Sequence, residues 1–303
     1  MAVLPGNVRA MKLGVFLQSP TVDEMIRDAL DVSARGIRSI WTPQIFGLDA
    51  VTALTVLGRE VPDITVGTAV VPTYPRHPSM LAAQARTAQQ VTAGRFTLGI
   101  GLSHQMVIEG MFGMSFDKPV RHLREYLDIL MPLVRGEAVA AAGETLTFQG
   151  ALEIPADPVP VLVAALGTQL LTLAGRRTEG TITWMTGSKT IGEHIAPTIA
   201  AAASAAGRPA PRVVACLPVC VTDDVEAGRA TAASVFEFYE YLPSYRAMLD
   251  REGVAGPADV AIVGNEATVR AALEATIEAG ATELVAVPFS NRERTLDLLA
   301  TMV

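Results

Sequence analysis

The chain has 303 residues, of which 50% are hydrophobic and 18% charged, so it can bury a large core and does not have the composition of a disordered protein. Its formal net charge of -7 disfavours nucleic acid and anionic membranes as partners, because both select basic surfaces. The sequence shows neither a membrane-span pattern nor a secretory leader, which predicts a soluble cytoplasmic protein.

Short apolar segments alternate with amphipathic ones along the chain. The apolar segments predict strands at 12–17, 39–42, 64–71, 96–101, 160–165, 181–185, 213–221 and 283–287. The amphipathic segments predict helices at 22–35, 50–59, 79–92, 121–134, 169–177, 192–206, 227–249 and 267–279. Eight strand–helix units without a linker predict an α/β fold, a closed (β/α)8 TIM barrel over residues 11–303 with an N-terminal extension of residues 1–10.

Two stretches interrupt the alternation. Residues 102–119 are rich in Met and Gly and could form either a lid over a site or a packed surface loop. Residues 136–158 form an insertion between the fourth helix and the fifth strand. Within it, residues 144–154 alternate and turn as a small β-hairpin does.

The two cysteines, Cys216 and Cys220, lie four residues apart in the seventh predicted strand, so both point to one face of it. They are too few for a disulfide framework, and no His, Asp or Glu cluster has metal-ligand spacing. We therefore expect two buried free thiols in a reducing compartment and no metal site.

The carboxyl ends of the strands of a parallel barrel meet on one rim, where barrel enzymes place their sites. The residues at that rim include no acidic pair, no nucleophile elbow and no Walker loop, which disfavours glycosidases, serine hydrolases of that type and nucleotide hydrolases. A rim poor in charge and rich in small residues suits a large flat cofactor that supplies the chemistry itself.

Two strand ends carry the polar groups of most interest. The fourth strand has two glycines and ends in Ser103 and His104, which adds one ionisable ring to the rim. The fifth strand leads through Gly167 and Thr168 into a helix whose first N–H groups could bind a phosphate. An ordinary strand-to-helix turn would use the same residue types, so the pattern alone leaves both interpretations open.

Five segments together resemble the bacterial luciferase-like oxidoreductases, and more closely the branch that uses coenzyme F420, a deazaflavin. The segments are residues 67–78, 94–104, 119–127, 164–167 and 183–187. The resemblance runs from about residue 11 to the C-terminus, and it implies a (β/α)8 barrel with an insertion. It also implies coenzyme F420 as the cofactor, with FMN as the alternative.

The resemblance places the cofactor at the rim. It implies a cis peptide bond between Ala69 and Val70, at the end of the third strand, that supports the ring system. It also implies that the turn at Gly167 receives the phosphate of the cofactor's tail. The cofactor-contacting residues that we expect are Thr42, Ala69, Val70, Gly101, Ser103, His104, Ala165, Leu166, Gly167, Thr168, Trp184 and Met185.

The implied chemistry is hydride transfer between the deazaflavin and a small organic substrate. His104 is expected either to transfer the accompanying proton, as an imidazole with a pKa of about 6.5 can, or to donate a hydrogen bond to the cofactor. At the end of the second strand, the sugar-phosphate branch of the family carries an Asp-His pair, whereas this chain has Thr42-Pro43-Gln44. A glutamine orients a substrate but is no base, so we expect reduction of a C=N or C=C bond rather than turnover of a sugar phosphate.

Two alternatives remain open at this point. One is an FMN-dependent monooxygenase on the same barrel, and the other is a barrel that binds a flavin-like ligand without turnover. Apolar helices on the barrel exterior predict a homodimer.

Overall fold

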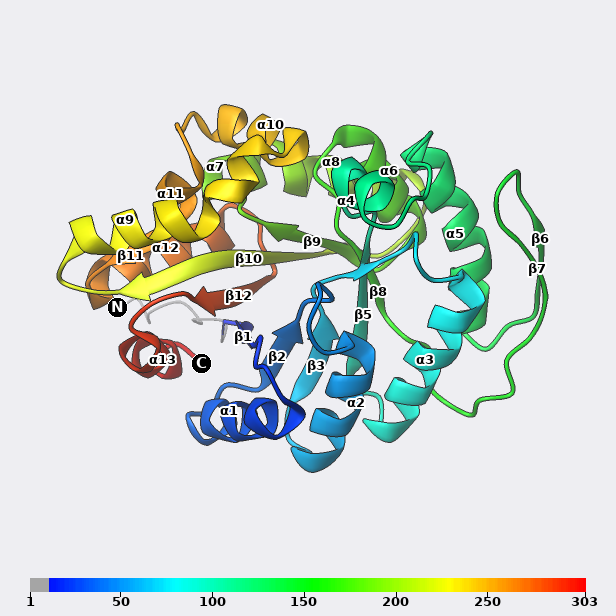
Figure 1. Ribbon diagram of the computed structural model, residues 1–303, viewed down its shortest axis with the longest axis horizontal. Coiled ribbons are helices and arrows are strands. Elements are labelled where there is room, and N and C mark those ends of the chain that lie inside the picture. Colours follow the sequence, from blue (N-terminus) through cyan, green and yellow to red (C-terminus); the bar gives the residue numbers. More distant parts are fainter. Residues whose placement is uncertain (1–10) are drawn as a thin grey trace, which may run out of the picture.

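Residues 11–303 are described by the structure, a computed structural model, and the expected extension of residues 1–10 lies outside them. Eight strand positions form a parallel barrel (Figure 1). They are occupied by β1 (Leu13–Phe16), β2 (Ser39–Thr42), β3 (Thr65–Thr68) with β4 (Val71–Pro72), β5 (Phe96–Gly101), β8 (Val161–Val163), β9 (Gly180–Trp184), β10 (Arg212–Val221) and β12 (Glu283–Pro288). Because β10 pairs with both β9 and β12, the sheet closes on itself. The predicted α/β class, a TIM barrel with an insertion, is confirmed.

Helices surround this barrel, most of them in positions that the sequence predicts. Thr21 caps the first of them by accepting a hydrogen bond from the N–H of Glu24, at 3.2 Å. The helices of the outer layer are α1 (Val22–Ala34), α2 (Ala50–Glu60), α3 (Pro78–Val91), α5 (Pro119–Val134), α6 (Thr168–Arg177), α8 (Ala196–Ala205), α12 (Glu266–Glu278) and α13 (Arg292–Ala300). The sequence pattern did not predict α13, because this helix is short and opens with charged residues rather than with an apolar period.

Small and large side chains fit together inside the barrel. Trp41 fills much of the interior with Leu162, Ile182 and Cys216, and a Cβ at Gly67 would fall 2.5 Å from the Trp41 ring. Cys216 and Cys220 are both buried free thiols, as predicted. They face the same side of β10, but Cys216 lies in the barrel interior and Cys220 lies beyond the rim, because this strand continues past its neighbour β9.

The third predicted strand is interrupted rather than continuous. The hydroxyl of Thr68 donates to the carbonyl of Gly99 and accepts from its N–H, both at 2.8 Å, so a side chain replaces the main-chain ladder at this point. A Cβ at Gly99 would lie 2.0 Å from the Thr68 carbonyl oxygen, which shows how closely the two strands approach. The chain bulges at Ala69 and Val70, whose peptide bond is cis as expected.

Two predicted helices are divided by prolines. Residues 192–206 form the π-helical turn η1 (Ile191–Ile195) followed by α8, because Pro197 cannot donate to the carbonyl four residues earlier. Residues 227–249 form α9 (Val225–Phe236), the 3-10 turn η2 (Glu237–Tyr241) and α10 (Pro243–Glu252), since the residue before Pro243 leaves the helical conformation.

Further short elements lie on the carboxyl side of the barrel. They are α4 (Gln105–Gly110) within the predicted lid segment, α7 (Ser188–Thr190) after β9, and α11 (Pro257–Val260) with β11 (Ile262–Gly264), which extends the sheet by pairing with the end of β10. In Figure 1, α7 and α10 lie next to each other in the upper part of the view. Within residues 11–303, no helix combines the length and apolarity that crossing a bilayer requires.

The insertion contains an antiparallel hairpin, but its position differs from the prediction. The strands are β6 (Val139–Ala142) and β7 (Thr147–Gly150), so residues 144–146 form the turn and not a strand. The turn falls here because the carboxylate of Glu125, on α5, accepts hydrogen bonds from the N–H groups of Glu144, Thr145 and Leu146 at 2.9 to 3.2 Å. That contact is made by a residue far away in the sequence, so local alternation could not reveal it.

Candidate active site

The ends of β5, β8 and β9 bring most of the predicted site residues to one rim of the barrel. Two of these residues, Ser103 and Met185, adopt left-handed backbone conformations with φ of +60° and +52°. Residues other than glycine rarely take this conformation, and those that do tend to gather at functional sites. The rim is thus a place where the fold accepts an unfavourable backbone at two separate strand ends.

His104 is half-buried at the start of α4, and its ring makes no hydrogen bond to any residue of the described chain. Burial lowers the pKa of this imidazole below its ordinary value, so the neutral form dominates at neutral pH. This shift modifies the expectation of a mixed charged and neutral ring. A neutral imidazole still donates from one nitrogen and accepts at the other, so it can relay a proton without carrying charge.

Gly101 and Val70 face each other across the bulge at the end of the third strand. A Cβ at Gly101 would lie 2.7 Å from Cγ2 of Val70 and 3.2 Å from Cβ of Ala164, so a larger residue would push against both. Val70, Gly101 and Ala164 therefore pack together at the rim, and we call these three apolar residues the floor. An uncharged surface of this kind suits a flat ring system.

The turn between β8 and α6 presents a free helix N-terminus. Gly167 is the N-cap residue of α6, no side chain of residues 11–303 bonds to the first N–H groups, and among the same residues nothing fills the space beside its Cα. The preceding carbonyl, that of Leu166, accepts a hydrogen bond from Nε2 of buried His194 at 2.8 Å. His194 therefore fixes the turn while the start of the helix keeps no side-chain cap, and helix starts of this kind can bind phosphate oxygens.

Thr42 and Gln44 lie at the rim, but both side chains form hydrogen bonds with the main chain. The Thr42 hydroxyl donates to the carbonyl of Leu17 at 2.6 Å, and Oε1 of Gln44 accepts from the N–H of Ala50 at 2.8 Å. Arg76 also contacts Gln44, at 3.3 Å, and forms an ion pair with Asp49. These contacts favour a role for Gln44 in fixing the start of α2, and its catalytic role stays a prediction.

The side chains of Trp184 and Met185, at the end of β9, have different surroundings. Trp184 is partly exposed and packs edge-on against Phe236 and Tyr239, with ring centroids 5.7 and 5.8 Å apart. Met185 is fully buried in a second cluster with Cys220 and Phe236, under α9 and α11. Of the two, Trp184 can reach a ligand with its side chain, whereas Met185 can do so only through its main chain.

A network of rings connects the rim to α5. The hydroxyl of Thr73 lies 3.0 Å from Nε2 of His122, and Tyr74 stacks on the same imidazole with ring centroids 3.9 Å apart. Burial lowers the pKa of His122 to about 4, although the nearby Glu125 opposes the shift. His122 is therefore neutral at physiological pH and supports the loop that follows β4.

Sequence reasoning missed Tyr245 and His194, both of which lie at or behind the rim. The ring of Tyr245, on α10, lies 5.7 Å from that of His104. Neither residue follows a barrel strand directly, and both come from helices that fold back over the rim. A signal was present for Tyr245, since it is the one aromatic residue on the apolar face of its helix, but the sequence does not show what that face covers.

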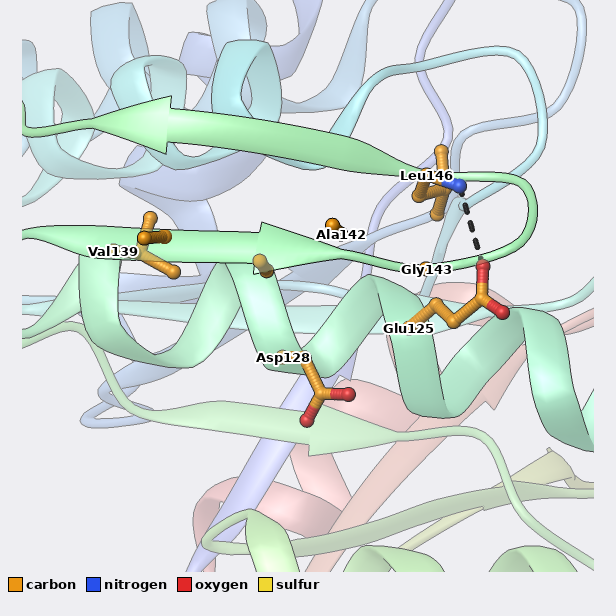
Figure 2. A pocket seen from close by; sticks show the side chains of 8 residues that line it. Glu125, Asp128, Val139, Ala142, Gly143 and Leu146 are labelled. Carbon is orange, nitrogen blue, oxygen red and sulfur yellow. Dashed lines mark hydrogen bonds between the residues drawn. The ribbon is translucent and has the colours of Figure 1, made fainter.

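The structure also has a cavity of about 300 Å³ between α5 and the hairpin, away from the rim (Figure 2). Glu125 and Asp128 line it, but both carboxylates are engaged, Glu125 by the hairpin turn and Asp128 by Arg177 at 2.6 Å. Burial opposes the ionisation of Glu125, yet its hydrogen bonds from residues 144–146 lower its pKa to about 2. The carboxylates that line this cavity therefore hold the hairpin and the neighbouring helix in place.

Among residues 11–303, no group of three or more His, Cys, Asp or Glu side chains could hold a metal ion.

The fold defines a class, that of (β/α)8 barrels, which place their sites at the carboxyl ends of the strands. The chain belongs to the luciferase-like monooxygenase family, whose family model matches residues 11–283. This match confirms the resemblance drawn from the sequence.

Individual relatives support the same assignment. The chain is 28% identical over 256 residues to a 5,10-methylenetetrahydromethanopterin reductase of Methanolobus tindarius, covering 82% of this chain and 78% of the relative. It is 27% identical over 181 residues to an F420-dependent glucose-6-phosphate dehydrogenase of Mycolicibacterium smegmatis, covering 57% of this chain and about half, 54%, of that relative. The structure of the coenzyme F420-dependent tetrahydromethanopterin reductase of Methanopyrus kandleri superposes with a TM-score of 0.83 at 19% identity, covering 97% and 99% of the two chains.

Proposed function

We propose that this protein is a coenzyme F420-dependent oxidoreductase that transfers a hydride between the deazaflavin and a small organic substrate, reducing a C=N or C=C bond. The observation that carries the proposal is the free N-terminus of α6 at Gly167, beside the apolar floor at Gly101 and Val70. One end of the site suits a phosphate and the other suits a flat ring. Relatives that are named for their use of F420 support the same cofactor.

Different residues of this chain would bind the tail phosphate, orient the ring and relay a proton. The N–H groups of residues 167–169 and the Thr168 hydroxyl would hold the tail phosphate, and the floor formed by Val70, Gly101 and Ala164 would orient the ring. When bound, the deazaflavin supplies a carbon centre that donates or accepts a hydride. His104, neutral because of burial, would relay one proton between water and the substrate at the same rim.

Exposed apolar side chains on the loops around the rim support an uncharged substrate. Phe46 follows β2, Met106 and Met111 belong to the segment after β5, and Tyr241 belongs to η2. Exposed apolar groups of this kind commonly mark ligand or partner surfaces. Together with the Thr42–Pro43–Gln44 sequence, they favour an imine or an enone over a sugar phosphate.

The experiment that tests the proposal begins with the cofactor. Purified protein is titrated with F420 and with FMN while tryptophan fluorescence is recorded, and retention of each is checked by gel filtration. We expect tighter binding of F420. Reduced F420 is then mixed with the protein and either 2-cyclohexen-1-one or 1-pyrroline. As a control, oxidised F420 is mixed with the protein and glucose 6-phosphate.

The outcomes separate the three candidate functions. Reoxidation of F420 by the enone or the imine supports the proposal. Preferential binding of FMN with oxygen consumption would instead indicate a monooxygenase. Tight binding of F420 without any turnover would indicate a carrier or sensor.

A further inference from the structure

One face of α10 lies over the barrel rim. Tyr245, Met248, Leu249 and Glu252 recur at intervals of three and four residues, so they share this face. Met248 and Leu249 are buried in the main core, and they fix the middle of the helix. The side chains at the two ends of the face, Tyr245 and Glu252, contact loops that follow barrel strands.

Tyr245 closes a row of rings across the rim. Its ring centroid lies 5.7 Å from that of His104 and 5.2 Å from that of Tyr239, which in turn packs edge-on against Trp184. Burial raises the pKa of Tyr245, and the neighbouring Tyr239 and Cys216 add to the shift, so the phenol stays protonated at neutral pH. Within the described chain its hydroxyl has no hydrogen-bond partner, so it is free to donate to a ligand that lies beside His104.

Glu252 holds this helix against the turn that follows β9. Its carboxylate accepts hydrogen bonds from the N–H groups of Thr190 and Lys189, at 2.8 and 3.2 Å. Gly187 makes room for this contact, because a Cβ there would lie 2.2 Å from Oε1 of Glu252 and the carboxylate would have to shift. We call this contact the rim clasp, and we call the equivalent contact of Glu125 with residues 144–146 the hairpin clasp.

We propose that Tyr245 is a substrate-contacting residue of the reaction site and that Glu252 is the residue that positions it. The inference rests on the proposed function. In the reductive direction the hydride leaves its C–H bond on the reduced deazaflavin and forms a C–H bond at the substrate carbon. The electron pair of the double bond moves to the imine nitrogen, or through conjugation to the enone oxygen, which takes up the proton relayed by His104. The Tyr245 hydroxyl donates a hydrogen bond to that nitrogen or oxygen.

The first arm of the test removes the hydroxyl alone. In Tyr245→Phe we expect kcat/KM for reduction of 2-cyclohexen-1-one or 1-pyrroline to fall by about 10- to 100-fold, the usual range for a hydrogen bond to an atom that gains charge. Binding of F420, measured by tryptophan quenching without substrate, is expected to stay within about twofold of the wild type. An unchanged kcat/KM would overturn the substrate contact.

The second arm measures positioning without turnover. Tyr245 packs against the buried cluster that contains Cys220, so the reaction of this thiol with an aromatic disulfide reagent reports whether the packing around the ring is kept. In a Cys216→Ala background, we expect Glu252→Gln and Gly187→Ala to raise the labelling rate of Cys220 at least tenfold. The matched hairpin-clasp variants Glu125→Gln and Gly143→Ala should label at the parent rate. Equal labelling in the rim-clasp variants and the parent would overturn the positioning role.

The two arms also separate this inference from the proposed function. If the wild type reduces neither the enone nor the imine, the proposed function fails and the substrate contact of Tyr245 fails with it. The labelling rates still decide whether Glu252 positions Tyr245. If the wild type turns over and Tyr245→Phe matches it, the proposed function stands and this inference falls.

Discussion

The rim clasp and the hairpin clasp use the same chemistry in different surroundings. In each, a helix-borne carboxylate accepts main-chain N–H groups from a distant loop, and a glycine makes room for it: Gly187 beside Glu252 and Gly143 beside Glu125. In the cavity beside the hairpin clasp both carboxylates are engaged, whereas on the rim the side chains of His104 and Tyr245 and the first N–H groups of α6 have no side-chain partner among residues 11–303. The comparison teaches that a strong local contact does not by itself mark a functional site, and it directs the search for one to the rim.

The largest expected effect lies on the rim side of this comparison. His104→Ala should slow turnover of reduced F420 by about 100- to 10,000-fold, the range typical of a lost proton-transfer group. It should leave the thermal midpoint near that of the wild type, because the imidazole makes no hydrogen bond within the described chain. Steady-state kinetics, with F420 binding measured in parallel, checks this. Equal losses in rate and in cofactor binding would reduce His104 to a binding residue.

His122 lies between Thr73, near the rim, and Glu125 of the hairpin clasp, and its contribution to folding stability depends on pH. Its folded pKa is about 4 against an ordinary value of 6.5, so the unfolded chain binds the proton more readily between these values. Folding stability is therefore intact above pH 6.5 and falls as the pH drops toward 4, by about 2 kcal/mol at pH 5.

Urea unfolding at pH 7.5 and pH 5.0 measures this loss. His122→Gln, which keeps a polar partner for Thr73 but does not titrate, should lose about 2 kcal/mol less than the wild type between the two pH values. Parallel losses in both proteins would show that other groups titrate instead. Glu125 does not interfere, because its pKa of about 2 keeps it ionised at pH 5.

Glu125→Gln breaks the hairpin clasp and should destabilise the protein by about 1 to 2 kcal/mol, with no effect on turnover. Because the folded pKa of Glu125 is lowered from 4.5 to about 2, its contribution is complete above pH 4.5 and disappears as the pH falls through 2. Hydrogen exchange at residues 144–146 reports the loss directly. A fall in kcat in this variant would contradict the separation of the two regions.

Substitution of Gly167 should change stability least but should change F420 binding clearly. Gly167→Asp adds a capping carboxylate at a position with open space and extended backbone, so the thermal midpoint should rise by the equivalent of a few tenths of a kcal/mol. The same carboxylate should repel a phosphate and weaken F420 binding at least tenfold. Gly167→Ser caps the helix without the charge and serves as the control. If both variants bind F420 like the wild type, the tail does not bind at α6.

Much of the barrel could be predicted because its strands are short apolar runs with polar residues at their ends. The bounds of β2 and β5 match the prediction, since each strand ends where the side-chain pattern changes. The predictions failed where a distant partner decides the local structure. Thr68 interrupts the third strand by bonding to Gly99, and Glu125 sets the hairpin turn. At the rim, His104 and Gly167 could be anticipated from strand order, whereas Tyr245 could not, because its helix packs back from a later part of the chain.

The strand β10 has one further consequence. It pairs with β9 and β12 inside the barrel, then runs past the rim and pairs with β11, which packs against α9. A single strand therefore belongs both to the barrel and to the segment of residues 222–261, whose helix α10 lies over the rim. We expect that exchanging this segment for the equivalent one of a relative would alter which ligands the rim accepts and leave the barrel strands intact.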